Sequence, residues 1–154
     1  MLLTKVFRVD QYEAALESWG WIGLEGRRPV LSSLFGDVFF KAPDGFWFLD
    51  TVEGTLTHRW ADRDALQRDL DSDEGQDQYL LGGLAIAAEH NGLALGVDEV
   101  YDFVQPPILG GKFAVENMTT MDFVVSLHIT GQLLGQVREL PPGTQITGFT
   151  VDGG

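Results

Sequence analysis

The sequence contains no cysteine among its 154 residues. Disulfide bonds, thiolate zinc sites and cysteine nucleophiles are therefore excluded. Basic residues are also few, with 10 lysines and arginines against 23 aspartates and glutamates and a formal net charge of −13. Proteins whose main task is nucleic-acid binding carry a basic footprint, so direct binding of nucleic acid is not expected. A basic protein partner fits this charge, although an acidic surface can also serve solubility alone.

Long apolar runs are missing as well. No stretch reaches the length of a membrane span, and residues 1–10 lack the apolar run of a signal peptide. We therefore expect a cytoplasmic protein without membrane contact. The length and the 44% hydrophobic content suit one core, hence a single domain over residues 1–154.

The common sequence signatures of enzymes are absent. The chain has no G-x-x-x-x-G-K-[ST], G-x-G-x-x-G or G-x-S-x-G motif. An EF-hand loop registered from Asp69 fails, because Glu74 stands where glycine is needed and Leu80 where a bidentate glutamate is needed. The histidines are too far apart for a helical metal-ligand pair, at positions His58, His90 and His128. We expect no metal, no cofactor and no enzymatic activity.

The first half of the chain predicts a helix followed by an antiparallel meander. Asp10 is a good helix N-cap with Glu13 three residues on, and Gly20 can close that helix before a loop that runs to residue 29. Short apolar runs separated by turn residues then predict strands over 31–35, 38–41, 46–50 and 55–60. The aromatic residues of the third run alternate between two faces, so one face is core and the other is covered by a helix or binds a protein.

The second half predicts mostly helices. A short helix is expected from Asp62 to Leu70 and a longer one from about Asp73 to His90, followed by an apolar segment with one strand before residue 103. The double proline at 106–107 requires an extended loop. A helix from residue 119 or 120 to 138 contains two glycines, which either weaken it or mark a close approach to the sheet. A last strand is expected over 146–151. Because strands and helices come in blocks, the fold class is α+β, with several helices packed on an antiparallel meander.

An ordered set of short motifs runs from about residue 34 to 147. The set comprises Phe35-Gly36-Asp37-Val38, Gly45-x-Trp47-x-Leu49-Asp50-Thr51 with Gly54, Tyr101-Asp102-Phe103, Pro106-Pro107-x-Leu109-Gly110-Gly111, Glu116-Asn117 with Asp122, His128-x-x-Gly131-Gln132 and Pro141-x-Gly143-Thr144. Together these motifs resemble a bacterial family of immunity proteins that neutralise DNase effectors delivered by type VI secretion. The family's shared region was long catalogued as a C-terminal domain of unknown function.

The resemblance implies a stoichiometric inhibitor without a cofactor. The resemblance implies that the protein binds its cognate protein toxin, a DNase in that family, in the cytoplasm and blocks the active site or its assembly. Unlike longer members of the family, this sequence does not hold a full extra N-terminal domain; residues 1–29 supply only a helix and a loop. Which surface binds the toxin therefore stays open.

Most of the motif residues are expected to be structural, since glycines suit turns and aspartates bond local backbone N–H groups. We call them the signature residues: Gly36, Asp50, Tyr101, Asp102, Pro106, Pro107, Gly110, Gly111, Asn117 and Gln132. The toxin contact is then expected elsewhere, on an acidic stretch that imitates phosphate charge toward a basic nuclease groove. We call these the acidic-stretch residues: Asp62, Asp64, Asp69, Asp71, Asp73, Glu74 and Asp77.

Two other functions remain as alternatives. One is a small ligand-binding domain or enzyme with a pocket near Tyr101, His128 and Gln132. The other is a structural or adaptor module. No motif specifies an oligomeric state.

Overall fold

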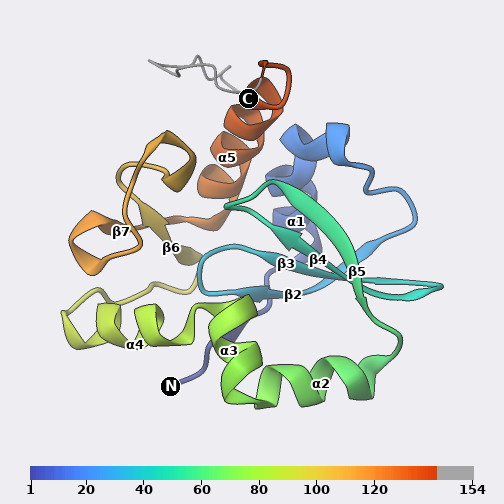
Figure 1. Cartoon of the computed structure of the whole chain (residues 1–154), viewed down its shortest axis with the longest axis horizontal. Coiled ribbons are helices and arrows are strands. Elements are labelled where there is room, and N and C mark those ends of the chain that lie inside the picture. The colour runs from blue at the N-terminus through green and yellow to red at the C-terminus, as the bar shows by residue number, and fades with distance from the viewer. Residues whose placement is uncertain (142–154) are drawn as a thin grey trace.

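Two antiparallel sheets form the framework of the protein, seen in a computed structural model that describes residues 1–141 (Figure 1). The larger has five strands in the order β1-β2-β3-β4-β5, namely β1 (Thr4–Lys5), β2 (Arg28–Ser33), β3 (Val38–Ala42), β4 (Gly45–Asp50) and β5 (Thr55–Trp60). The smaller pairs β6 (Glu99–Phe103) with β7 (Met118–Asp122). The predicted α+β fold and its meander are confirmed, whereas the strand expected over 146–151 lies outside the described residues.

The helices cover both faces of the large sheet. They are α1 (Val9–Leu16), which continues as the 3-10 helix η1 (Glu17–Ile22), α2 (Arg63–Asp71), α3 (Asp73–Leu80), α4 (Gly82–His90) and α5 (Phe123–Val137). Short 3-10 turns η2 (Pro107–Leu109) and η3 (Val115–Asn117) lie in the connection between β6 and β7. Helices α1 and α5 lie together on one side of the sheet, and α2 and α3 lie on the other (Figure 1).

Side-chain alternation divides the aromatic strands between two cores. Phe39, Phe48 and Trp60 are buried against α2 and α3, whereas Phe40 and Leu49 are buried against α1 and α5. Period-2 alternation along β3 and β4 produces this division. Helices therefore cover both faces of the predicted aromatic cluster, so the cluster belongs to the hydrophobic core.

A third apolar cluster attaches the β6–β7 pair to the end of the large sheet. Leu34 and Phe35, at the β2–β3 turn, pack with Tyr101 and Met118 of the pair and with alanines of α4. Tyr101 N–H also donates to the carbonyl of Leu34 at 2.7 Å. The small sheet is thus attached at one end of the large sheet and adds no strand to the meander.

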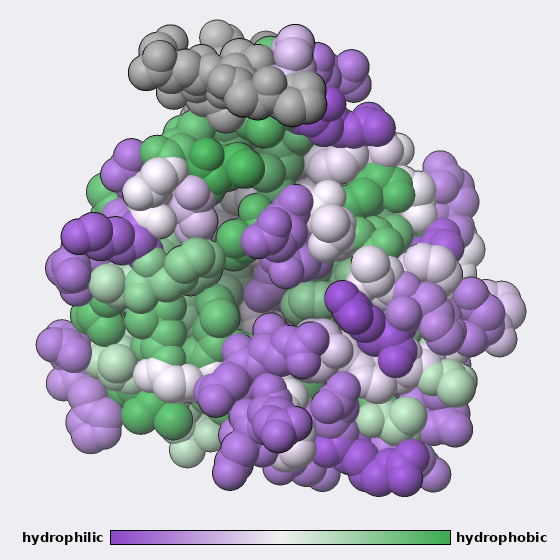
Figure 2. Space-filling model, in the orientation of Figure 1, coloured by the Kyte–Doolittle hydropathy of each residue, from purple (hydrophilic) through white to green (hydrophobic). Residues whose placement is uncertain are grey.

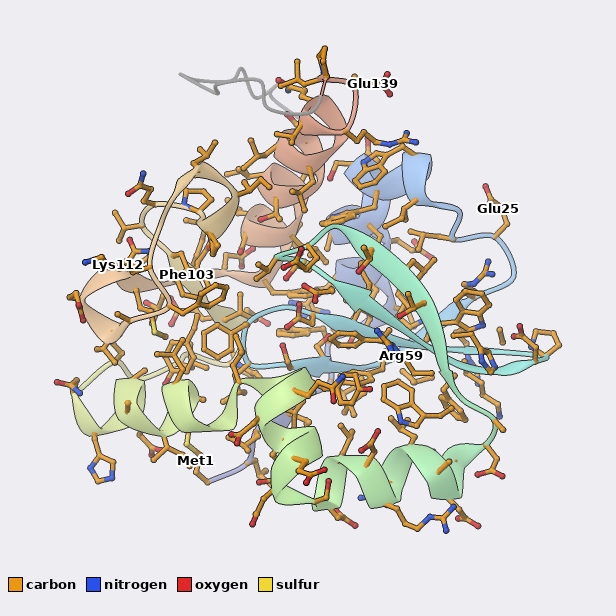
Figure 3. All side chains as sticks on the ribbon, viewed as in Figure 1. Met1, Glu25, Arg59, Phe103, Lys112 and Glu139 are labelled. Atoms are coloured by element: carbon orange, nitrogen blue, oxygen red, sulfur yellow. The ribbon has the colours of Figure 1, made fainter. Side chains whose placement is uncertain are left out.

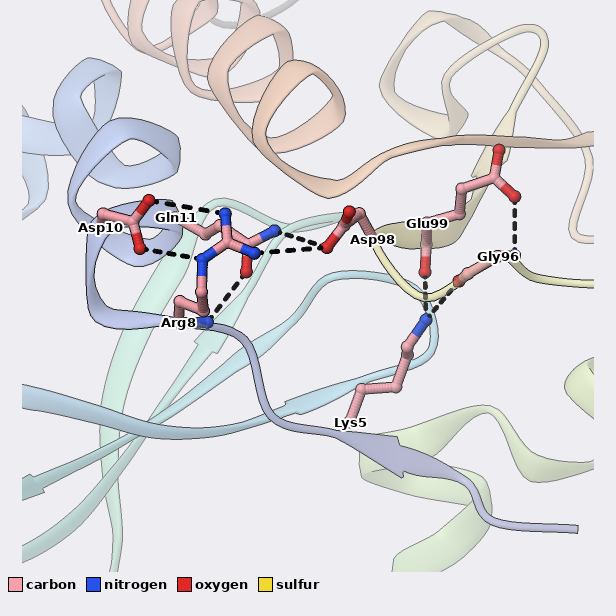
Figure 4. Close-up of polar contacts among 7 residues, drawn as sticks. All are labelled: Lys5, Arg8, Asp10, Gln11, Gly96, Asp98 and Glu99. Carbon is pink, nitrogen blue, oxygen red and sulfur yellow. Dashed lines mark hydrogen bonds and ion pairs between the residues drawn. The ribbon is translucent and has the colours of Figure 1, made fainter.

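The N-terminal segment ties the same pair down from the other side. Lys5 Nζ donates to the carbonyls of Gly96 at 2.8 Å and Glu99 at 2.7 Å, and Gln11 Nε2 donates to Asp98 Oδ1 at 2.9 Å (Figure 4). These contacts join residues about 90 positions apart, so they position β6 against β1 and α1.

The first helix begins and ends at other residues than predicted. Its N-cap is Arg8, whose N–H donates to Gln11 Oε1 at 2.9 Å, while Asp10 lies in the first turn and binds the Arg8 guanidinium. Glutamine takes the place that a capping-box glutamate would have. The helix then tightens into η1 and ends at Gly23, where φ is 91°.

The helix predicted over 73–90 is wrong, because Leu81 interrupts it. Leu81 has φ 49° and ψ 47° and separates α3 from α4. A left-handed leucine costs roughly 1–2 kcal/mol, and Gly82-Gly83, which follows, is a poor helix former. The break lets Leu80 enter the α2–α3 core while Leu81 packs on the third cluster. Packing in two directions thus outweighs the local helical pattern.

The last helix begins later than predicted. Residues 118–122 form β7 by pairing with β6, and Asp122 caps α5 by accepting from Val125 N–H at 3.1 Å. The glycines of this helix mark a close approach, but to η1 and not to the sheet. A Cβ on Gly131 would overlap Ser18 Oγ and the Trp19 ring, where Trp19 Nε1 donates to the carbonyl of Leu127 at 2.9 Å.

We expect Gly131→Ala to destabilise the fold by about 1–3 kcal/mol, because the added methyl group overpacks the α5–η1 contact. Gly83→Ala is the matched control: its Cβ meets nothing within 4 Å, so it should stabilise α4 by about 0.5–1 kcal/mol. Urea unfolding followed by tryptophan fluorescence measures both changes. A Gly131→Ala protein at least as stable as wild type would show that the approach is not tight.

Candidate functional site

A cleft opens where the small sheet meets the large one. It has two parts on either side of the β4–β5 turn, and both include Val52. Figure 2 shows apolar residues gathered over β6, β7 and their connection, with a hollow between this side and the strands of the large sheet. In Figure 3, Phe103 projects from β6 toward this region and Lys112 lies at the outer edge.

The first part is an apolar hollow of about 50 Å³ under the double-proline loop. Its walls come from the β2–β3 turn, β6, the loop and α5, through Phe35, Tyr101, Phe103, Ile108 and Leu134. Asp102 and Ser126 supply polar groups there. The second part, which we call the carboxylate pocket, has a volume of about 120 Å³ and is lined by Asp37, Asp50 and Glu53 together with Phe48, Tyr79 and Phe113.

Asp37 is the most deeply buried carboxylate in this cleft, with 5% of its surface exposed. Its Oδ1 accepts from Thr51 N–H at 2.9 Å and from the Thr51 hydroxyl at 2.7 Å, and its Oδ2 accepts from the Ser33 hydroxyl at 2.8 Å. These bonds tie the β2–β3 turn to the end of β4. Burial, reinforced by repulsion from Asp50, raises the pKa of Asp37 to about 6 despite those hydrogen bonds.

Asp50, a signature residue, holds the next turn. Its Oδ1 accepts from Val52 N–H at 2.9 Å and from Glu53 N–H at 3.0 Å. Such bonds from an aspartate to the following backbone stabilise a turn. This local contact agrees with the structural role expected for Asp50, while its position on the pocket wall also places its charge in the cleft.

Asp102 joins the small sheet to α5. Its Oδ2 accepts from the Ser126 hydroxyl at 2.9 Å and its Oδ1 from Phe103 N–H at 2.8 Å. Burial raises the pKa of Asp102, while the bonds from Ser126 and Phe103 act in the opposite direction. Beside it, Tyr101 is buried, and its hydroxyl donates to the carbonyl of Leu93 at 2.8 Å.

The double-proline loop is held in one shape by Asn117. The Asn117 side chain accepts from Gln105 N–H and donates to the carbonyls of Gln105 and Lys112, all at 2.9 Å. Gly111 lies so close to the carbonyl of Gln105 that any Cβ there would collide with it. Signature residues Asn117 and Gly111 thus set the loop that forms one wall of the cleft, and Pro106, Pro107 and Gly110 build its η2 turn.

Two residues of the predicted ligand pocket lie elsewhere. Tyr101 lines the apolar hollow, but His128 and Gln132 do not. Gln132 Nε2 is 2.8 Å from His128 Nε2 on α5, and the carbonyl of His128 accepts from the Ser18 hydroxyl at 2.7 Å. The pocket expected on these three side chains is therefore not formed.

The acidic-stretch residues lie on α2 and α3, across the sheet from α1. Three of them accept hydrogen bonds: Asp62 caps α2 by accepting from Ala65 N–H at 2.9 Å, Asp69 Oδ2 accepts from Trp60 Nε1 at 2.9 Å, and Asp71 Oδ1 accepts from Gln67 Nε2 at 3.0 Å. All of the acidic-stretch residues except Asp69 are exposed. The stretch thus exposes mostly acidic side chains, with Arg63 and Arg68 of α2 among them.

The residues that sequence reasoning missed are those whose role needs a distant partner. Asp37 and Thr51 stand inside the quoted motifs, but nothing local shows that they bond each other. Ser126 and Phe113 carried no signal in the sequence, because each acquires its role only through its contacts in the cleft.

Within residues 1–141 there is no group of three or more His, Asp or Glu that could hold a metal ion. Over the same residues no helix is both long and apolar enough to cross a membrane.

Comparison with known proteins finds a family model that matches part of this region. The family model described as "T6SS immunity protein Tdi1, C-terminal" matches residues 62–134. No curated protein is similar enough in sequence to count as a match. Among solved structures, the crystal structure of Atu4351 from Agrobacterium tumefaciens is similar with a TM-score of 0.56 and 16% identity, over 84% of this chain. The match spans 66% of that chain, and at this identity it shows the fold alone.

The raised pKa of Asp37 predicts a pH-dependent stability. Because the folded value of about 6 exceeds the unfolded value of about 3.9, the stabilisation from this group is complete below about pH 4 and is lost as pH rises through about 6. The difference in unfolding free energy between wild type and Asp37→Asn should fall by up to roughly 3 kcal/mol between pH 4 and pH 7.5. Urea unfolding at several pH values measures it.

Asp50→Asn serves as the companion variant. Removing the repelling charge should move the midpoint of the Asp37 transition to lower pH. If the difference in unfolding free energy between wild type and Asp37→Asn does not change with pH, the raised pKa of the buried Asp37 carboxylate is wrong.

Proposed function

We propose that this member of a type VI secretion immunity family binds and neutralises a cognate toxin by stoichiometric inhibition, and that the toxin is a nuclease. The observation that supports the proposal most directly is the family match, which runs from the N-cap of α2 into α5. The matched segment contains the whole acidic surface and much of the cleft wall. No bond-making step is assigned to the protein, because occupying the toxin is sufficient for inhibition.

Electrostatics favours a basic target. A nuclease must bind a phosphate backbone, so its substrate groove carries positive potential. The chain presents a net charge of −13, with exposed carboxylates concentrated on α2 and α3. Opposite potentials speed association and disfavour wrong partners. An interface of standard size, ~1,600 Å² in total, would cover these helices together with a neighbouring surface.

The alternative of a small enzyme or ligand-binding domain has less support. It required Tyr101, His128 and Gln132 to line one pocket, but His128 and Gln132 bond each other and do not line the hollow beside Tyr101. The apolar hollow of about 50 Å³ that Tyr101 does line has room for about one or two water molecules at ~30 Å³ each. We further propose that the protein acts in the cytoplasm of the toxin-producing cell, in a pair with a toxin encoded beside it.

Co-expression with the neighbouring open reading frame tests the proposal. We expect the chain to restore growth of cells that express the toxin and to co-purify with it in a fixed ratio. The toxin, once released from the complex, should degrade DNA, and added immunity protein should stop the degradation at equimolar amounts. Growth arrest that persists, or inhibition that needs turnover of a substrate, would contradict stoichiometric neutralisation.

Charge neutralisation on α3 and the end of α2 tests the acidic surface separately. We expect the triple variant Asp71→Asn, Glu74→Gln and Asp77→Asn to associate with the toxin about tenfold more slowly at low salt and to show a flatter salt dependence. These positions avoid Asp62 and Asp69, whose contacts stabilise the fold.

The matched control removes the same number of charges elsewhere. Glu13→Gln, Glu17→Gln and Glu25→Gln lie on α1, η1 and the following loop, and Glu25 projects away from α2 and α3 (Figure 3). Stopped-flow association rates compare the two proteins. Equal rates for both triple variants would show that net charge matters and the α2–α3 surface does not.

A further inference from the structure

The carboxylate pocket has an unusual combination of walls. Its rings are Phe48, Tyr79 and Phe113, and its aliphatic contacts come from Val52 and Leu81. The groups lining it that are charged at neutral pH are all acidic: Asp37, Asp50 and Glu53. The walls come from the β2–β3 turn, from β4 with the turn that follows it, from α3 with the α3–α4 junction, and from the double-proline loop, so four separate parts of the chain converge there.

The negative charge in this pocket has no cationic partner. Asp37 is almost fully buried and bonds only hydroxyl and amide groups. Asp50 uses Oδ1 for the turn, and its Oδ2 has no hydrogen bond within residues 1–141. The ion pairs among these residues involve Arg8 and Arg138, neither of which lines the pocket. Buried carboxylates are stabilised by a paired cation, and here the chain supplies none.

One basic residue acts electrostatically on the pocket wall, but it forms its hydrogen bond elsewhere. Arg59 influences Tyr79, but its Nε donates to the Thr57 hydroxyl at 3.0 Å, and it does not line the pocket. Figure 3 shows Arg59 over the strands. No lysine or arginine of residues 1–141 lines the pocket, so a cation that neutralises Asp37 and Asp50 there would come from another molecule.

Size and shape favour one planar side chain. The pocket holds about 120 Å³, and a cavity of roughly 150 Å³ admits a benzene ring. A guanidinium group is planar, stacks on aromatic rings and forms two parallel bonds to a carboxylate, whereas an ammonium does not. Phe113 is 52% exposed and stands in edge contact with Phe103, so it is available to cover an incoming side chain.

The pocket wall also contains a strained residue. Leu81 is the one non-glycine residue with positive φ within residues 1–141. Backbone strain of this kind persists where the surrounding structure over-determines it, and it concentrates at ligand sites. The strain keeps Leu81 and Tyr79 on the wall although they belong to two different helical segments.

We propose that the carboxylate pocket binds an arginine side chain of the toxin, with Asp50 and Asp37 as counter-ions and Phe113 and Tyr79 as ring walls. The inference rests on the proposed function, because the arginine belongs to the protein that this chain neutralises. The exposed apolar residues Val104 and Ile108, on the same loop as Phe113, then contact the residues that flank the arginine. The acidic α2–α3 surface steers the encounter, and the pocket fixes the docked position.

The pocket can be tested without the toxin, with N-acetyl-arginine amide as the probe. Titration into the full chain, followed by amide NMR shifts, should perturb Thr51, Val52 and Phe113. The lysine analogue should bind several-fold more weakly, and the norleucine analogue should not perturb these residues. Asp50→Asn and Phe113→Ala should each weaken binding of the arginine probe about tenfold. Equal binding of the norleucine and arginine probes, or preferred binding of an acidic analogue, would overturn the proposal.

The pH dependence supplies a second readout. Cation binding favours the ionised form of Asp37, so affinity for the arginine probe should fall several-fold between about pH 7.5 and pH 5. The groups that face Asp37 are Asp50, Glu53 and Tyr79 on the pocket wall, with Arg59 acting on Tyr79. Asp37→Asn should bind more weakly and lose most of this dependence. An affinity that rises toward pH 5 would exclude Asp37 as a counter-ion.

Toxin binding separates failure of this inference from failure of the proposed function. Wild type should bind a catalytically inactive toxin encoded beside the chain, and Asp50→Asn and Phe113→Ala should weaken that binding at least tenfold through faster dissociation. Glu116→Gln on the same loop and Val97→Ala, both exposed and outside the pocket, should bind like wild type. If wild type binds and the pocket variants bind equally well, only the arginine pocket is wrong. If the amide NMR shifts of the pocket residues depend on protein concentration, a second copy of the chain occupies the pocket. The pocket is then a dimer contact, and the inference also fails.

Discussion

Burial of both faces of the five-stranded sheet is the constraint on which the rest of this structure depends. Strand alternation places large aromatic side chains on each face, and exposed rings on either one would leave a large apolar surface in water. Helices from both ends of the chain are therefore required on the first face, and α2 with α3 on the second. The β6–β7 pair can then reach only the end of the sheet.

The cleft follows from this arrangement. Because the small sheet is attached through the third cluster and the N-terminal contacts of Lys5 and Gln11, it does not close against the strands along its whole length. One wall of the space that remains is the double-proline loop, whose backbone Asn117 holds through three hydrogen bonds. A loop that is already held in one shape lowers the entropic cost of docking, since less has to be ordered when a partner arrives.

Negative charge has two different environments in this protein. On α2 and α3 the carboxylates are exposed and screened by solvent, which suits long-range attraction and gives little stability. In the cleft, Asp37 is surrounded by protein and costs free energy when it ionises. The same residue organises two turns through its hydrogen bonds. Asp37 is thus needed for the fold, but its negative charge is unfavourable in the free protein. A partner that neutralises this charge would therefore be favoured.

Several elements could be predicted from sequence because their causes are local. The Pro43-Asp44-Gly45 and Glu53-Gly54 turns delimit strands that pair with their immediate neighbours. Asp62 was expected at the start of a helix and caps α2. The failures have non-local causes. The helical pattern breaks at Leu81 so that Leu80 and Leu81 can enter two different clusters, and β7 exists only because β6, about twenty residues earlier, offers it a partner.

The candidate site divides in the same way. Asp50, Asp102 and Asn117 could be selected from the sequence, and their contacts with nearby backbone agree with the structural role expected of them. Ser126, Phe113 and the convergence on Asp37 could not, since their partners lie far away along the chain. His128 and Gln132 were grouped with Tyr101, but on α5 their side chains bond each other, and neither lines the hollow beside Tyr101.

By itself the sequence determined the charge, the meander, the helical segments and the turns, since each depends on composition or on residues a few positions apart. Only the tertiary structure decided which carboxylates are buried, where the cleft opens and which rings line it. Burial and close approach are properties of surfaces brought together from distant positions, and a one-dimensional pattern does not contain the distances that set them.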